Sequence, residues 1–155
     1  MNIRIFTSSY NNCKYGNLIS ISGDRGKRAE FNGKAIPELA PKFKFWQVWH
    51  DNIGKIPEEE NTRYYIEQYY NQVLSKVNIE ELLKEEKDPI LLCYEDSNQF
   101  CHRHTVAEYI EIKYGILVHE ITISNNLDIK EKTRPENIKR LLLETIKKCE
   151  KLEER

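Results

Sequence analysis

The sequence predicts an α/β fold: a single three-layer α/β/α domain over residues 1–155, with a mainly parallel central sheet. Short apolar segments typical of strands alternate with longer segments that have the apolar periodicity of helices, which is the pattern of βαβ units. One strand-like segment, 88–95, is apolar without interruption, as expected for a strand buried on both faces of a parallel sheet. A chain of 155 residues suits one domain with one core.

The first half of the chain supplies two strands, a loop and two helices. Segments 3–8 and 17–22 are short, rich in isoleucine and end in serine, which predicts strands. Residues 22–41 contain three glycines and two prolines and are expected to form a loop. A helix is predicted over 42–52. A second helix opens at Pro57 with glutamates in its first turn, where proline and acidic side chains are both favoured.

The second half continues the alternation of strands and helices. Residues 78–87 predict a short helix with asparagine at its N-cap, and 88–95 predict the buried strand. Residues 104–115 predict a helix that ends at a glycine, and 116–123 predict another strand. The last segment, from residue 134 onward, has its apolar residues on one face and predicts an amphipathic helix.

The composition excludes some classes of protein. The chain has 24 basic and 25 acidic residues, a net charge of −1, which argues against a generally cationic nucleic-acid binder. No apolar stretch reaches the ~18 residues of a membrane span, and Met1 leads into a strand-like segment rather than a signal peptide. We therefore expect a cytoplasmic protein with no membrane partner, whose four cysteines are thiols rather than a disulfide framework. No cofactor is predicted, and the oligomeric state stays open.

The fold class also predicts where a ligand would bind. In parallel sheets, ligands bind beyond the carboxyl ends of the strands, at a topological switch point. This rule brings the loops after Ser8, Ser22 and Cys93 to one edge of the sheet. Ser8 and Ser22 could supply hydroxyl groups to a ligand there, and Arg25, in the loop 22–28, could supply a cation for phosphate. The same residues could equally form turns and a solvated loop.

The most informative segment is CHRHT, residues 101–105, at the predicted start of a helix. The first turn of a helix has unpaired N–H groups and a partial positive charge. Arg103 adds a guanidinium group, so that Arg103, His104 and Thr105 predict a binding site for phosphate or carboxylate. Cys101 lies near that cation and that helix end, which makes it a candidate for a reactive thiolate.

Three more residues complete the predicted site. Cys93, at the end of the buried strand, is a second candidate for the reactive thiol, and His102 and Glu95 are candidates for proton transfer. The spacing C-x7-C-H-x-H does not match the short paired spacings of structural zinc sites, so no metal site is predicted.

Structural alternatives stay open for the same residues. Cys93 could be a packed residue of the core, since free cysteine is among the most buried residue types. Arg103 could pair with Glu108 or Glu95 without contacting a ligand. The sequence does not decide whether Cys93 and Cys101 face each other. If they do, they could form a reversible redox pair.

The chain resembles the domain-of-unknown-function 488 family. Members of that family carry LLC-x-E at a strand end, a short polar insert and CHR at the start of a helix; the equivalents here are LLCYE at 91–95 and CHRHTVAE at 101–108. Upstream, IFTSSY at 5–10, ISIS at 19–22 and LAP at 39–41 resemble the shorter subgroup of the family. The resemblance implies an α/β fold with a site around the Cys-His-Arg motif, and it assigns no reaction.

Three functions are consistent with these observations. We expect an enzyme or ligand binder for a small anionic molecule, phosphorylated or nucleotide-like, at the Cys-His-Arg loop. The first alternative is a nucleic-acid-associated module, in which the loop 22–28 and exposed aromatic side chains contact a single strand. The second alternative is a structural or partner-binding protein whose Cys-His-Arg loop has a purely architectural role.

Overall fold

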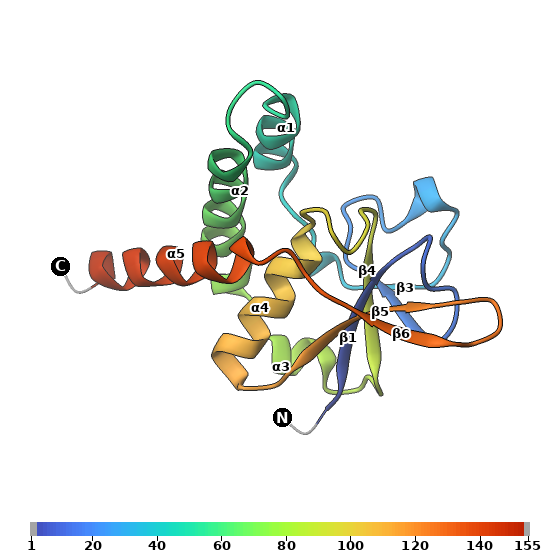
Figure 1. Ribbon diagram of the computed structural model, residues 1–155. Coiled ribbons are helices and arrows are strands. Elements are labelled where there is room, and N and C mark those ends of the chain that lie inside the picture. The colour runs from blue at the N-terminus through green and yellow to red at the C-terminus, as the bar shows by residue number, and fades with distance from the viewer. Residues whose placement is uncertain (1–2, 154–155) are drawn as a thin grey trace.

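A six-stranded sheet organises the part of the chain that the computed structural model describes, residues 3–153 (Figure 1). The strands are β1 (Ile5–Ser9), β2 (Asn17–Ser20), β3 (Lys34–Ala35), β4 (Pro89–Cys93), β5 (Val118–Ile123) and β6 (Ile129–Lys132). Their order in the sheet is β3-β2-β4-β1-β5-β6, and every neighbouring pair is parallel except β5 and β6. The α/β class and the mainly parallel sheet are therefore confirmed.

The α-helices gather on one side of this sheet. They are α1 (Phe43–Asp51), α2 (Glu58–Gln72), α3 (Ile79–Leu83), α4 (His102–Tyr114) and α5 (Asn137–Glu153), with 3-10 helices η1 (Lys27–Ala29), η2 (Pro37–Leu39) and η3 (Leu74–Lys76). Figure 1 shows α2, α4 and α5 on one side and the loops before and after β2 on the other. The second outer layer is thus made by loops and η1. Within residues 3–153, no helix combines the length and the apolar character needed to cross a bilayer.

The helix ends follow the signals in the sequence. The Asn78 side chain accepts a hydrogen bond from the Glu81 N–H at 3.1 Å, so it caps α3 as predicted. Gly115 ends α4 in the left-handed conformation, with φ of 67°, which a residue without a Cβ adopts at low cost. Helix α4 begins at His102, two residues before the expected start, because Cys101 takes the extended N-cap conformation.

The sequence analysis does not predict two of the strands, β3 and β6. Strand β3 is only two residues long and lies within the predicted loop 22–41. Strand β6 has the sequence IKEK, and all of its residues are exposed. Neither segment has the apolar alternation that identifies a half-buried strand, because both lie at the edges of the sheet.

Each face of the sheet has its own apolar cluster. Along β4, Leu91 belongs to the large cluster beneath the helices, whereas Ile90 and Leu92 belong to a smaller cluster on the loop side. This alternation follows from the two-residue period of a strand. Tyr10 and Phe31 come from the loops that cover the smaller cluster. Both faces of β4 are therefore buried, as its uninterrupted apolar sequence predicts.

The connections between strands diverge at the carboxyl ends of β2 and β4. These two strands are neighbours in the sheet. The chain leaves β2 towards the edge strand β3, whereas it leaves β4 through α4 to β5, on the far side of β1. This divergence is a topological switch point, where parallel sheets leave a crevice between the loops.

We expect Leu91→Ala to destabilise the folded chain by about 2–5 kcal/mol, because Leu91 is fully buried at the centre of the sheet and its truncation leaves a cavity. The matched control is Leu117→Ala, since the Leu117 side chain is 69% exposed and should change the free energy of unfolding by under about 0.5 kcal/mol. Urea-induced unfolding measures both. Equal losses in the two variants would contradict the described core.

Candidate active site

A cleft of about 440 Å³ opens at this switch point. The loop after β2 contributes Ser22, Asp24 and Arg28 to its lining, and the end of β4 contributes Cys93, Tyr94 and Glu95. Helix α1 adds Phe43 and Trp46, and the first turn of α4 adds His102. Cationic, acidic, aromatic and sulfur-bearing side chains thus meet at the position that the fold class predicts for a ligand.

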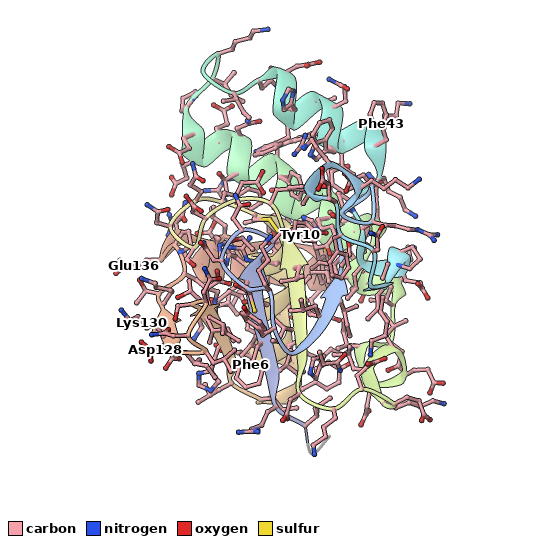
Figure 2. The ribbon with its side chains drawn as sticks, turned by 90° about the vertical axis from the view of Figure 1, so that its right-hand side faces the viewer. Phe6, Tyr10, Phe43, Asp128, Lys130 and Glu136 are labelled. Atoms are coloured by element: carbon pink, nitrogen blue, oxygen red, sulfur yellow. A yellow bond between two sulfur atoms is a disulfide. The ribbon has the colours of Figure 1, made fainter. Side chains whose placement is uncertain are left out.

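A larger groove lies elsewhere on the molecule. It measures about 1050 Å³ and is lined by the β5–β6 hairpin, by Asn11, Asn12 and Lys14, and by residues 96–98. Its side chains are mainly asparagine, lysine, serine and threonine, and its lining includes no cysteine, histidine or arginine. Figure 2 shows Asp128 and Lys130 on this hairpin, at the opposite side of the view from Phe43. The smaller cleft is the better candidate site, because it holds the cysteine, histidine and arginine side chains that the larger groove lacks.

Asp24 joins the two loops that form the cleft. Its carboxylate accepts hydrogen bonds from the backbone N–H groups of Gly26 at 2.8 Å and Arg28 at 3.1 Å, and from the Tyr94 hydroxyl at 2.5 Å. The Ser22 hydroxyl donates a further bond at 3.2 Å. Partial burial alone would raise the pKa of Asp24, but these hydrogen bonds outweigh it and lower the pKa below its usual value. The ionised Asp24 side chain therefore links the loop after β2 to the end of β4 through Tyr94.

Arg28 places a positive charge at the rim of the cleft. Its guanidinium lies 4.3 Å from the centre of the Tyr94 ring, which is a cation–π contact. Arg28 is exposed, and among residues 3–153 its guanidinium has no hydrogen-bond or ion-pair partner. Its N–H donors are therefore available to a ligand.

Phe43 and Trp46 form the aromatic wall of the cleft. Their ring centres are 6.1 Å apart and their planes differ by 29°, which is a stacked arrangement. Phe43 is 72% exposed, and Figure 2 shows it projecting from α1 at the outside of the molecule. An exposed aromatic ring beside a cleft that also holds charged side chains is a suitable platform for a planar ligand.

Cys93, Cys101 and His102 form the floor of the site. Cys93 is the last residue of β4 and Cys101 precedes α4, and their sulfur atoms are joined in a disulfide. The expectation that all four cysteines are thiols is therefore wrong for these two, because the loop 94–100 returns the chain to the edge from which it left. Cys13 and Cys149 are free.

His102 is held in one orientation. Its Nε2 atom lies 2.7 Å from the carbonyl oxygen of Ile21, and its Nδ1 atom lies 3.9 Å from the Cys101 sulfur. Burial lowers the pKa of His102 to about 4; the Ile21 carbonyl opposes this effect and the Arg103 charge adds to it. The imidazole is therefore neutral at neutral pH.

Arg103 is buried beneath the cleft in an ion pair with Glu120. Its Nε donates to one carboxylate oxygen at 3.1 Å and its Nη2 to the other at 2.8 Å, and both side chains are fully buried. Thr7 and Ser97 donate the remaining hydrogen bonds to Glu120, at 2.6 and 2.7 Å. Burial alone would raise the pKa of Glu120, but Arg103, His104 and the Thr7 hydrogen bond lower it to about 2. The third guanidinium nitrogen, Nη1, lies 3.3 Å from the Cys93 sulfur.

The structure separates the predicted site residues into two groups. Those that line the cleft, or are bonded to a residue that lines it, are Ser22, Cys93, Glu95, Cys101 and His102. Those that do not line it are Ser8, Arg25, Arg103, His104 and Thr105. Arg103, which the sequence predicts to bind a ligand, instead forms a buried ion pair in the structure. Its partner is Glu120 rather than Glu108 or Glu95.

Burial explains why four of these five residues, all but Arg25, lie outside the cleft. The Ser8 hydroxyl donates to the carbonyl oxygen of Ile121 at 2.6 Å, inside the sheet. His104 is fully buried, with Nδ1 3.8 Å from Glu120, and Thr105 is also fully buried. Burial, together with Arg103, lowers the pKa of His104 to about 3 despite Glu120. Arg25 is exposed on the loop, away from the lining.

Sequence reasoning missed Tyr94 and Glu120 and chose Arg25 in place of Arg28. Glu120 could have been found, because it occupies a buried position of β5, where the strand alternation calls for an apolar residue. A carboxylate at such a position needs a cation or several donors. No comparable signal separates Arg28 from Arg25, since both lie in the same glycine-containing loop.

The fold and the cleft define an α/β protein with a mixed polar and aromatic crevice at the switch point of a parallel sheet. A family model described as the active DUF488-N3 subclade matches residues 19–113. The chain therefore belongs to the DUF488 family, as its motifs indicate. Comparison with curated proteins and comparison with solved structures each found no match. All the residues that line the cleft lie within the matched range.

Glu120→Gln should lower the free energy of unfolding at neutral pH by about 3–5 kcal/mol, because it leaves Arg103 buried without a counter-charge. The double variant Arg103→Met, Glu120→Leu removes both charges and should recover part of that loss. Glu144→Gln, at an exposed ion pair with Arg63, is the matched control and should cost under about 1 kcal/mol. Urea-induced unfolding gives all three values.

The same pair predicts the direction of the pH dependence. The pKa of Glu120 is about 2 in the folded chain and 4.5 without these contacts, so the unfolded chain binds the proton more readily. The stability that ionised Glu120 provides is fully present above about pH 4.5 and is lost as the pH falls towards 2. The difference between wild type and Glu120→Gln should therefore shrink from pH 7 to pH 3. A constant difference would count against the ionised pair.

Proposed function

We propose that the cleft binds a nucleotide-like molecule and that the chain is an enzyme acting on it. The observation that carries the proposal is the meeting of the unpaired Arg28 guanidinium with the aromatic pair Phe43 and Trp46 in one crevice. A guanidinium suits a phosphate group, and an aromatic platform suits a base. The proposal assigns the anion to Arg28, because the donors of Arg103 are engaged with Glu120 and directed at Cys93.

The floor of the cleft supports a reaction rather than binding alone. His102, Cys93 and Glu95 line the same cavity as the proposed ligand contacts. The proposal keeps the catalytic roles predicted for His102 and Glu95, and it assigns the predicted thiol role of Cys93 or Cys101 to the reduced form of the protein only. The description of the matching subclade as active is consistent with it.

Titration calorimetry against a nucleoside monophosphate, the corresponding nucleoside and inorganic phosphate tests the proposal. The nucleotide should bind more tightly than either fragment, because only the nucleotide reaches both Arg28 and the aromatic wall. Arg28→Gln should weaken its binding roughly tenfold or more, the value of a charge-assisted hydrogen bond. Phe43→Ala should weaken it by the roughly 1–3 kcal/mol of a stacked base, since Phe43 is the exposed ring of the wall.

Arg25→Gln is the matched control, because Arg25 lies in the same loop but outside the cleft. It should leave the dissociation constant unchanged. Equal losses in Arg25→Gln and Arg28→Gln would show general electrostatic attraction instead of a site. Absence of nucleotide binding in both the oxidised and the reduced protein would end the proposal.

A further inference from the structure

We propose that, in the reduced protein, Cys93, Cys101 and His102 bind one zinc ion at the floor of the cleft. The two sulfur atoms and one ring nitrogen of His102 all lie within 4.8 Å of one another, and all three residues are buried. Two thiolates and an imidazole are the ligands that zinc prefers. The inference deepens the proposed function by adding a cofactor to the same site. Zinc binding itself does not depend on that function; only the identity of the ligand that approaches the ion from the cleft rests on it.

The hydrogen bond of His102 prepares its ring for a metal. The carbonyl oxygen of Ile21, 2.7 Å from Nε2, can only accept, so Nε2 carries the proton and Nδ1 carries the lone pair. Nδ1 lies 3.9 Å from the Cys101 sulfur. Metal-binding histidines commonly donate their other N–H to a carbonyl or carboxylate in this way, which fixes the tautomer and the ring orientation.

The spacing of the two cysteines also suits an ion between them. Zinc lies about 2.3 Å from a thiolate and about 2.0–2.1 Å from an imidazole nitrogen, so tetrahedral ligand atoms lie roughly 3.4–3.8 Å apart. The separation of Cys101 and His102 is already close to this value. The Cα atoms of Cys93 and Cys101 are 7.2 Å apart, beyond the roughly 4.4–6.8 Å usual for bonded cysteines, which leaves room for the sulfurs to separate.

The charges balance at this position. A dithiol reductant converts the disulfide to two protein thiols and is itself oxidised to a disulfide, with two electrons and two protons transferred. Zinc then displaces the two thiol protons, and the two thiolates neutralise its charge. Arg103 Nη1, 3.3 Å from the Cys93 sulfur, is placed to donate a hydrogen bond to that ligand.

The fourth coordination position would face the cleft, because two of the three ligands, Cys93 and His102, line it. Three protein ligands with one open position are the arrangement of catalytic zinc sites, whereas structural sites have four ligands. Glu95 lines the same cleft and would be the proton-transfer group beside such a position. The sequence spacing does not match that of structural sites with four ligands, which is why no metal site is predicted from the sequence, but it does not test a three-ligand site whose first ligand comes from a strand end.

The test uses the full chain, reduced with a dithiol and then freed of reductant and metal under anaerobic conditions. Zinc is added without any nucleotide, and the bound metal is measured after dialysis by elemental analysis. One zinc ion per chain is expected, and Co²⁺ in its place should give the thiolate-to-cobalt absorption bands of a tetrahedral site. Cys101→Ser should abolish stoichiometric uptake. His102→Gln should weaken it by at least the roughly 10- to 100-fold that loss of a supporting partner costs.

Cys149→Ser is the matched control, since Cys149 is a free cysteine away from the cleft, and its uptake should equal that of wild type. A readout without variants guards against misfolding: zinc should protect Cys93 and Cys101 of the wild-type chain, but not Cys149, from alkylation detected by mass spectrometry. No uptake by the reduced, folded chain would overturn the proposal, as would uptake that survives Cys101→Ser. Nucleotide binding measured on metal-free protein tests the proposed function separately.

Discussion

The buried ion pair between Arg103 and Glu120 fixes the arrangement on which the site depends. It joins the first turn of α4 to β5, and Thr7 and Ser97 extend the contact to β1 and to the loop after β4. Removing two charges from water costs several kcal/mol per ion unless each is fully hydrogen-bonded, so a displaced α4 would leave both groups uncompensated. The start of α4 therefore has one position relative to the sheet. All the other features of the cleft floor follow from that position.

With α4 fixed, Cys101 and His102 come to lie over the end of β4. The loop 94–100 must then return to the point where the strand ended, which brings Cys101 to Cys93. His102 reaches across to the carbonyl of Ile21, beyond the end of the neighbouring strand β2. The site is thus held by contacts to two strands, and Asp24 joins the loops of the same two strands through Tyr94.

Local patterns in the sequence predict most elements, because a cap or an apolar period acts within a few residues, as Asn78 and Gly115 show. Such local patterns do not predict that Glu120 is the ion-pair partner of Arg103. Glu108 is close in sequence, but five residues on a helix correspond to a rotation of about 140°, so the two side chains leave different faces. Glu120 becomes the partner only once β5 lies beside β1. The order of the strands, which places β4 between β2 and β1, likewise depends on packing over the whole chain.

The disulfide at the floor of the cleft would give the same atoms a second chemical form on reduction. Joined to each other, the sulfurs of Cys93 and Cys101 offer no ligand and no nucleophile. Once reduced, they become two donors beside an oriented imidazole and a buried guanidinium. The surrounding contacts, Arg103 with Glu120 and His102 with Ile21, involve neither of these two sulfurs, so reduction of the disulfide breaks neither contact directly. Under the zinc proposal, the fold supports the same side chains before and after reduction, and the reducing power of the surroundings decides whether the two sulfurs are joined or free to bind the ion.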